Sequence, residues 1–344
     1  MEIITKNGKN YLSTFVAKID NEQIDAGKFF LDVREATEKI IADYNRKYQK
    51  NYTFLDKSMY GYSLQALLNR FCGSYFSPSF IKGYMTNPAL HVVANCFEED
   101  VNDSTAIGTT FHKIMEIYYS LPPEERNREK LIDITKQTLT EGQDEERMLD
   151  LVCGYMVSKD YKGGEMDDTT LTCDVEKYGK AKYITKTFDG VTKTLPCDIS
   201  YVADRLDYRD DGVYIIDYKT GRPRTDSATF DGYLGSMILY KWGIEQELGV
   251  DVKGAYLMFP SGNHNEKWCE MDFSEQNQKE MFERVEACHK QLLADNRSRR
   301  YRYTDKGYFN TEDAKAFRNI MNDSSIRMAK LPMLLYIGES KDAY

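Results

Sequence analysis

The sequence predicts an α/β fold, in which helices flank a mixed central β-sheet and a helical region lies on its N-terminal side. Two observations support this class. Strand-like runs rich in Thr, Val, Ile and Tyr fill residues 170–220, and a helix, a strand and a helix alternate over residues 233–293. Strands joined by short turns pair antiparallel, whereas strands separated by a helix can pair parallel. The sheet is therefore expected to contain both kinds of pair.

The composition is that of a globular protein. The chain has 344 residues, 41% of them hydrophobic and 29% charged, and its net charge is -9. This composition excludes a disordered chain, a collagen and a small disulfide scaffold. The acidic balance argues against a protein that coats nucleic acid through bulk positive charge. It leaves open an enzyme that holds nucleic acid through a divalent metal ion and local basic patches.

The cysteines and the absence of long apolar runs indicate the compartment. Seven cysteines are present and none stands in a CxxC pair. A disulfide framework or a zinc ribbon is not expected, and a reducing cytoplasm is the expected location. The first residues lack the apolar stretch of a signal peptide, and no run of about 18 apolar residues occurs, so no transmembrane helix is expected.

The elements ahead of the sheet are expected to be helices. Residues 29–47 have a helical pattern, and Ser63 is a candidate N-cap for a helix that follows it. Residues 105–120 place five apolar side chains on one helix face, and Pro122-Pro123 then ends the helix: Ile107, Phe111, Ile114, Met115 and Tyr118. One or two further helices are expected over residues 124–161.

The later elements follow from period-2 patterns and turn residues. The expected strands cover residues 170–177, 182–188, 200–208, 212–219 and 254–259. The expected helices among them cover residues 233–248 and 275–293.

The motif with the most chemical content is a hairpin over residues 201–221, YVADRLDYRDDGVYIIDYKTG. Its centre, Asp-Asp-Gly, has the chemistry of a hairpin turn. Because side chains alternate along a strand, Asp217 and Lys219 share one face. A two-residue loop at 210–211 places Asp204 opposite Asp217, and a loop at 211–212 places Asp204 opposite Lys219.

Either register brings the three charged side chains to one face, with opposed Cβ atoms roughly 5 Å apart. Two carboxylates at that separation repel each other unless a cation lies between them, and hard oxygen ligands suit Mg²⁺ or Mn²⁺. A neighbouring lysine can then orient or deprotonate an attacking water and stabilise charge on a phosphate. The alternative is an ordinary surface hairpin with an Asp–Lys ion pair. Against that alternative, Ile215 and Ile216 indicate a strand buried on both faces.

The pattern D…DYKTG, at residue 204 and residues 217–221, resembles the core of the PD-(D/E)XK nucleases, and specifically their RecB-like and AddB-like branch. Three more segments occur in the order of that family. They are YSLQALLNRFCGSYF at 62–76, GTTFHKIME at 108–116, which resembles a G-x-x-x-H-x-x-x-E helix, and MILY at 237–240, in the place of a Q-x-x-x-Y motif. The resemblance implies a restriction-endonuclease-like core.

The resemblance also implies roles for single residues. His112, Asp204 and Asp217 resemble the metal ligands of the family, with the carbonyl of Tyr218 near the metal, and Lys219 resembles the catalytic lysine. Further candidates lie close to these residues in the sequence or within a run of basic residues. Tyr240, Ser236, Thr220, Arg222, Arg299 and Arg300 are candidates for substrate binding, and Glu176 and Glu116 are additional acidic candidates.

Two departures from the family pattern bear on these roles. Ser236 stands where the family has a glutamine, and Tyr201 stands where it often has a glycine. Some relatives carry an iron–sulfur cluster on Cys72 and three C-terminal cysteines, but only Cys269 and Cys288 follow the hairpin here. We therefore expect no cluster.

The expected organisation is an N-terminal extension (1–60), a nuclease domain (61–296, helical over 61–165 and catalytic over 166–296) and a basic and polar appendage (297–344). The resemblance implies a Mg²⁺- or Mn²⁺-dependent exonuclease that hydrolyses phosphodiester bonds in DNA recombination, repair or processing, in a bacterial or phage setting. DNA is the expected partner, together with a helicase or recombination protein. A nuclease-fold DNA-binding or assembly subunit with weak turnover and an RNA-directed nuclease are the alternatives.

Overall fold

The computed structural model divides the chain into two compact units, residues 101–282 and residues 1–100 with 283–344. The structure describes residues 3–6, 9–12, 16–19, 22–25, 39, 42–43, 45–49, 75–88, 91, 103–140, 142, 144–223, 227–263, 265–298, 301–302, 304 and 328–329.

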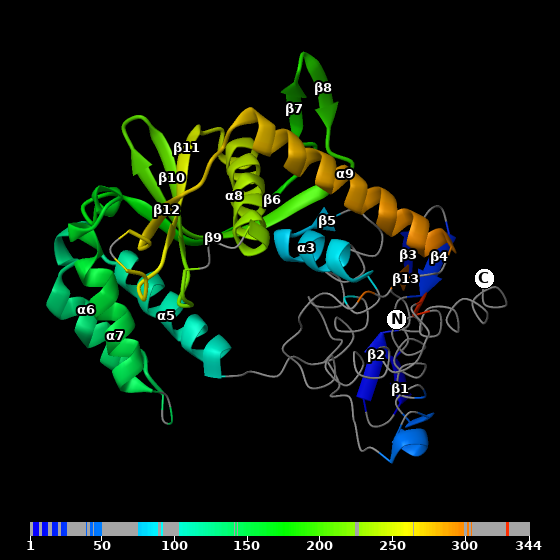
Figure 1. The fold of residues 1–344 in the computed structure, drawn as a ribbon, viewed down its shortest axis with the longest axis horizontal. Coiled ribbons are helices and arrows are strands. Elements are labelled where there is room, and N and C mark those ends of the chain that lie inside the picture. The colour runs from blue at the N-terminus through cyan, green and yellow to red at the C-terminus, as the bar shows by residue number, and fades with distance from the viewer. Residues whose placement is uncertain are drawn as a thin grey trace. The chain divides into compact units, whose positions relative to one another are not determined.

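A five-stranded mixed sheet forms the centre of the unit 101–282, in the order β12-β11-β10-β9-β6 (Figure 1). Its strands are β6 (Cys173–Ala181), β9 (Asp198–Arg209), β10 (Gly212–Tyr218), β11 (Val252–Met258) and β12 (Trp268–Glu270). The pair β10–β11 is parallel and the other three pairs are antiparallel. This arrangement confirms the predicted α/β class with a mixed sheet.

Helices α5 (Asp103–Tyr119), α6 (Arg128–Thr138) and α7 (Glu145–Met156) lie together on one face of the sheet (Figure 1). The five apolar positions predicted for one face of α5 are all buried, and they pack with Ile216, Tyr218 and Met258 of the sheet. Side chains of Asn127 and Asp144 accept hydrogen bonds from the first turns of α6 and α7, which fixes where these helices begin.

Helix α8 (Ser227–Leu248) contributes to the core on the other face of the sheet. Met237 and Ile244 pack there with Leu206, Ile215 and Leu257. Because α8 connects the parallel strands β10 and β11, these three elements form a βαβ unit. The sheet is thus covered on both faces, and its central strand β10 is buried, as the run Ile215-Ile216 indicated.

A second hairpin, β7 (Thr185–Phe188) and β8 (Val191–Thr194), projects from the end of β6 (Figure 1). The long helix α9 (Glu275–Ser298) starts in the same unit and crosses the boundary at residue 283. Short 3₁₀ segments connect the helices: η1 (Pro123–Glu125), η2 (Val157–Asp160) and η3 (Gly164–Met166).

The other unit contains several short elements. These are the hairpins β1 (Ile3–Lys6) with β2 (Lys9–Leu12) and β3 (Val16–Ile19) with β4 (Glu22–Asp25), the strand β5 (Tyr75–Phe76), helix α3 (Pro78–Thr86), and β13 (Tyr301–Arg302) paired with β14 (Met328–Ala329). Ser77 caps α3, and Tyr84 of α3 donates a 2.7 Å hydrogen bond to Asp295 of α9.

Most predicted elements of the sheet region are confirmed within a few residues. The structure has two helices in the range 124–161, and it adds β8 and β12, which the sequence reasoning missed. The predicted helix at 29–47 is helical at its described residues, and the predicted helix after Ser63 lies outside the described residues. Within the described part of the chain, no helix combines the length and the apolar character that a membrane crossing requires.

Candidate metal and phosphodiester site

The hairpin β9–β10 has the first of the two registers considered above. Arg209 pairs with Gly212 and Arg205 with Ile216, so a two-residue turn joins the strands. The regular ladder stops there, one position before Asp204 and Asp217. Beyond that point the Asp204 carboxylate accepts a 2.8 Å hydrogen bond from the backbone N–H of Tyr218. The strands therefore separate where the two aspartates lie.

Helix α5 brings His112 to this gap between the strands. Its Nε2 lies 3.0 Å from the carbonyl oxygen of Tyr218, and its Nδ1 lies 3.4 Å from Oδ2 of Asp204. Burial alone would lower the pKa of His112, but the hydrogen bond and negative charge of Asp204 outweigh burial and raise it. Burial would raise the pKa of Asp204, but His112, Lys219 and the N–H of Tyr218 lower it.

Glu176 of β6 completes a group of three possible metal ligands. One ligand atom from each of His112, Glu176 and Asp204 lies within 4.8 Å of the other two. Glu176 has a φ of 45° inside a strand, in the left-handed region that a long side chain rarely adopts. Such local irregularities redirect a side chain at the cost of backbone strain. Burial and the charge of Asp204 raise the pKa of Glu176, as expected for neighbouring carboxylates.

Asp217 and Lys219 form an adjacent ion pair. Asp217 is buried, and its burial raises its pKa to about 6, against the opposing effect of Lys219. Burial would lower the pKa of Lys219, but Asp217 and Asp204 raise it, so Lys219 carries its charge at neutral pH. The backbone N–H of Lys219 donates to Met258 of β11, which fixes the residue at the end of the sheet.

The remaining candidates differ in how close they lie to this cluster. Burial and the charges of Asp217, Asp204 and Glu176 raise the pKa of Tyr240, so its ring lies near the carboxylates. Ser236 donates its hydroxyl hydrogen to the carbonyl of Gly232 within α8.

Thr220 is half-buried next to Gly108 of α5, whereas Arg222 is exposed. Glu116 pairs with Lys113 at 2.8 Å. Arg299 and Arg300 lie outside the described residues.

Sequence reasoning missed a buried charged network beneath the site, on the α5 side of the sheet. Arg205 is fully buried, and it donates to Asp167 at 3.1 Å, to the hydroxyl of Tyr218 at 2.9 Å and to Asp207 at 3.0 Å. Tyr119 and Tyr155 donate to Asp167 at 2.7 and 2.8 Å. Tyr218 thus links this network to the site, because its hydroxyl contacts Arg205 while its backbone contacts His112 and Asp204.

A signal for part of this network was present in the sequence. Arg205 directly precedes Leu206 inside the predicted strand 200–208, and an arginine inside a buried strand must find buried partners. Asp167 carries no such signal, because it follows a 3₁₀ turn far away in the sequence.

The donor set suits a divalent cation. A half-buried imidazole and two carboxylates converge in the structure, one of them the half-buried Asp204, and carboxylate oxygens are the ligands that Mg²⁺ and Mn²⁺ prefer. The positive charge of Lys219 lies beside these ligands, where it can bind or stabilise an anionic phosphate.

Comparison with known protein families agrees with this chemistry. The sequence model of the PD-(D/E)XK nuclease superfamily matches residues 75–308, about two thirds of the chain, and the chain belongs to that superfamily. The match covers the sheet, the three candidate ligand residues and Lys219, and it supports a nuclease that hydrolyses phosphodiester bonds with the divalent metal ions that this superfamily usually uses. No curated protein matches the chain in sequence.

Proposed function

We propose that the protein is a Mg²⁺- or Mn²⁺-dependent DNA exonuclease of the RecB-like and AddB-like branch. The observation that carries the proposal is the convergence of His112, Glu176 and Asp204 beside the ion pair of Lys219 and Asp217. The D…DYKTG hairpin, the helix that carries His112 and the half-buried Tyr240 resemble the motifs of this branch, and this resemblance supports the proposal.

The proposed metal ligands are His112, Glu176 and Asp204, with Asp217 and the carbonyl of Tyr218 next to them. A divalent cation held there would polarise the phosphate and lower the pKa of a water molecule at the site. Lys219 remains charged and stabilises the negative charge that develops on the phosphate in the transition state. Asp217 holds the ammonium group of Lys219 in place, and Tyr240 contacts the substrate close to the carboxylates.

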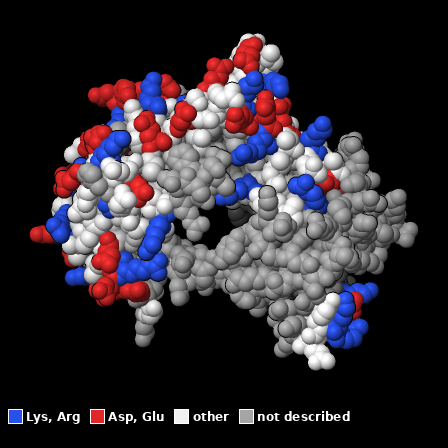
Figure 2. Space-filling view, in the orientation of Figure 1, with Lys and Arg blue, Asp and Glu red and all other residues white. Residues whose placement is uncertain are grey.

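The wider role follows from the branch. We propose DNA recombination, repair or processing in the cytoplasm of a bacterium or in a phage, together with a helicase or recombination protein. The nuclease domain would extend over residues 61–296, with the appendage at 297–344 adding basic contacts to DNA through Arg299 and Arg300. Thr220, Arg222 and Ser236 would contact the substrate strand nearer the cleaved bond. Figure 2 shows acidic and basic side chains interspersed on the described surface, so binding to DNA would depend on local contacts.

The test is degradation of end-labelled linear DNA compared with closed circular DNA, with and without Mg²⁺ or Mn²⁺. An exonuclease degrades the linear substrate only, and only with metal. The Lys219→Ala variant should lose this activity, whereas Lys162→Ala, which removes an exposed lysine near η3, should keep it. Inactivity on linear, circular and single-stranded DNA, or full activity of Lys219→Ala, would refute the proposal. Metal-independent DNA binding without cleavage would favour an assembly subunit, and preference for an RNA competitor would favour an RNA-directed nuclease.

A further inference from the structure

The end of β6 presents an exposed tyrosine in an unusual backbone conformation. The side chain of Tyr183 is 75% exposed, the highest value among the large apolar side chains of the described residues. Its φ is 56°, in the left-handed region. A bulky side chain in that region is strained, and glycine or asparagine would occupy the position at lower free energy. Both the exposure and the strain are costs that fold stability alone does not explain.

Lysines are frequent near Tyr183 in the sequence, although three of them pair with acids. Residues 177–194 contain five lysines and one aspartate, and Lys177, Lys180 and Lys186 pair with Asp174, Asp198 and Glu245. Lys182 is exposed and makes no ion pair with any residue that the structure describes. A lysine without a partner next to an exposed aromatic ring is the combination that binds the phosphate and the base of a nucleic-acid strand.

Contacts at the β7–β8 hairpin hold this region firmly. Phe188 packs edge-on against Phe282, with ring centroids 5.6 Å apart. Lys186 pairs with Glu245 of α8 at 3.1 Å, and Lys279 pairs with Asp189 of the turn at 2.6 Å. Lys182 and Tyr183 therefore lie on a fixed segment between β6 and an anchored hairpin. A preorganised surface of this kind loses little conformational entropy on binding.

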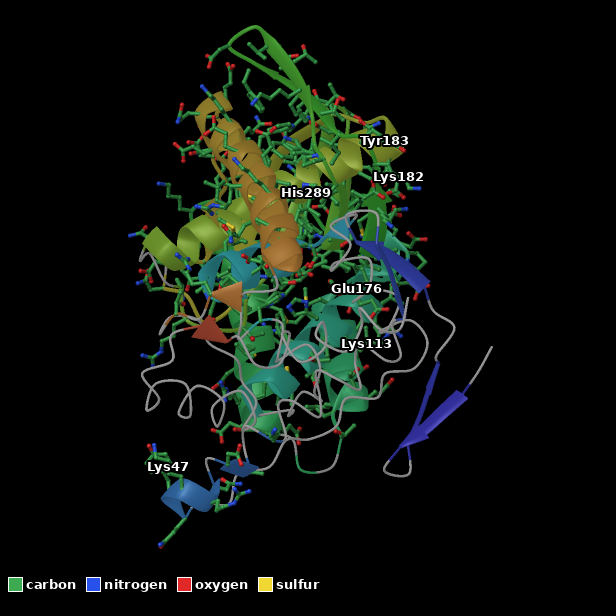
Figure 3. All side chains as sticks on the ribbon, turned by 90° about the vertical axis from the view of Figure 1, so that its right-hand side faces the viewer. Lys47, Lys113, Glu176, Lys182, Tyr183 and His289 are labelled. Atoms are coloured by element: carbon green, nitrogen blue, oxygen red, sulfur yellow. The ribbon has the colours of Figure 1, made fainter. Side chains whose placement is uncertain are left out.

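The same strand leads from Tyr183 to the metal ligands. Glu176 lies six residues before Lys182, which corresponds to about 20 Å along a strand. Between them, Tyr178 and Val202 are cross-strand neighbours on β6 and β9, with exposures of 51% and 41%. Figure 3 shows the labelled Lys182 and Tyr183 close together, with the labelled Glu176 further down in the view. The exposed side chains of Tyr178 and Val202 thus lie between Glu176 and Lys182.

We infer that Lys182 and Tyr183 form an accessory site for a single DNA strand, separate from the cleavage site. Tyr183 stacks on a base, Lys182 contacts a phosphate, and Tyr178 lies along the path of the strand toward Glu176. A single strand is favoured over a duplex because a ring can stack only on a base that is not paired and stacked within a helix. The inference rests on the proposed nuclease function for the direction of the strand, but the binding itself does not require cleavage.

The experiment measures the fluorescence anisotropy of a labelled oligothymidylate of about 16 nucleotides, a length within the range of strand-binding sites. A chelator is present, so no metal-dependent cleavage can occur. Tyr183→Asn removes the ring but keeps a residue that tolerates the left-handed conformation, so its melting temperature should equal or exceed that of the wild type. The expected affinity of Tyr183→Asn is about tenfold lower, and Lys182→Ala should also bind more weakly.

Two matched variants serve as controls. Val157→Ala removes an exposed apolar side chain at η2, and Lys162→Ala removes an exposed lysine, and both should bind as the wild type does.

Equal affinities of wild type and Tyr183→Asn for the long strand would overturn the inference. An equal loss of affinity for duplex DNA would also overturn it, because a stacking site requires unpaired bases. Tighter binding of an oligouridylate than of the oligothymidylate would contradict the inference that the site binds DNA. No cleavage occurs in this measurement, so it tests strand binding separately from nuclease activity. The binding inference can hold if the protein proves not to be a nuclease, and it can fail if the protein is an active nuclease.

Discussion

Replacing Arg205 by methionine should destabilise the protein more than any single change at the proposed metal ligands. Arg205 is fully buried, and its guanidinium group contacts two carboxylates, Asp167 and Asp207, as well as the rings of Tyr119 and Tyr218. Methionine has a similar length and no charge. The substitution therefore keeps most of the packing and leaves two buried carboxylates without their cation.

The size of the effect follows from this geometry. Removing one partner from a buried ion pair costs about 3–5 kcal/mol, compared with a total stability of about 5–15 kcal/mol for a domain. Burial already raises the pKa of Asp207 beside Arg205, and the loss of Arg205 should raise it further. The Asp207 carboxylate should then bind a proton as the pH falls, so the destabilisation should be smaller at low pH than at neutral pH.

Urea unfolding followed by circular dichroism measures this loss. With a slope of about 1–3 kcal/mol per molar urea, a loss of about 3–5 kcal/mol should lower the midpoint by roughly 1–5 M. The triple variant Arg205→Met with Asp167→Asn and Asp207→Asn should recover part of the stability, because no buried charge remains. A loss below about 1 kcal/mol in the single variant, or a triple variant no more stable than the single one, would refute the account of the network.

Three further predictions concern the site. Lys219→Met should lower the rate of DNA cleavage by at least about 100-fold while the thermal stabilisation by Mn²⁺ persists, and a variant that cleaves at the wild-type rate would contradict the role of Lys219. Glu176→Gln should weaken Mn²⁺ binding, measured by calorimetry, by at least about tenfold, and unchanged affinity would remove Glu176 from the ligand set. The raised pKa of His112 means that its pairing with Asp204 stabilises the metal-free protein at pH values below about 6.5, and that this stabilisation is lost as the pH rises through the raised pKa. Mn²⁺ affinity should rise over the same range because a ligating imidazole must be neutral. The measurement is the melting temperature as a function of pH, without and with Mn²⁺. The same pH dependence in both series would argue against His112 as a ligand.

The sequence predicted the class of fold because its elements are individually well marked. Helix α5 has five buried positions at helical spacing, and the hairpin β9–β10 has turn residues that leave only two registers on one face. Strands β8 and β12 were missed for a physical reason. β8 is exposed on all four residues and β12 has three residues, so neither has the apolar alternation that burial would impose.

The candidate site was predicted in part. The sequence placed His112, Asp204, Asp217 and Lys219 together through the hairpin geometry and the family motifs. It included Glu176 only as an additional candidate, because its place in the cluster depends on a left-handed backbone conformation within β6. Local sequence preferences do not reveal such a conformation at a glutamate, since the neighbouring strand and the charges around it impose it.

The interaction of Arg205 with Asp167 was not predictable either. The two residues are 38 positions apart and meet only when α7, the segment after it and β9 pack together. An acidic partner for the arginine could be expected from its burial, but the choice among the many aspartates of the chain depends on tertiary packing.

The central claim is that His112, Glu176 and Asp204 hold the divalent cation of a nuclease. The most direct measurement is anomalous X-ray diffraction from crystals soaked in Mn²⁺. The account predicts an anomalous peak within about 2.5 Å of the imidazole of His112 and the carboxylates of Glu176 and Asp204, and its loss in the Glu176→Gln and Asp204→Asn variants. A peak at other residues only, or no peak under conditions in which the protein cleaves DNA, would contradict it.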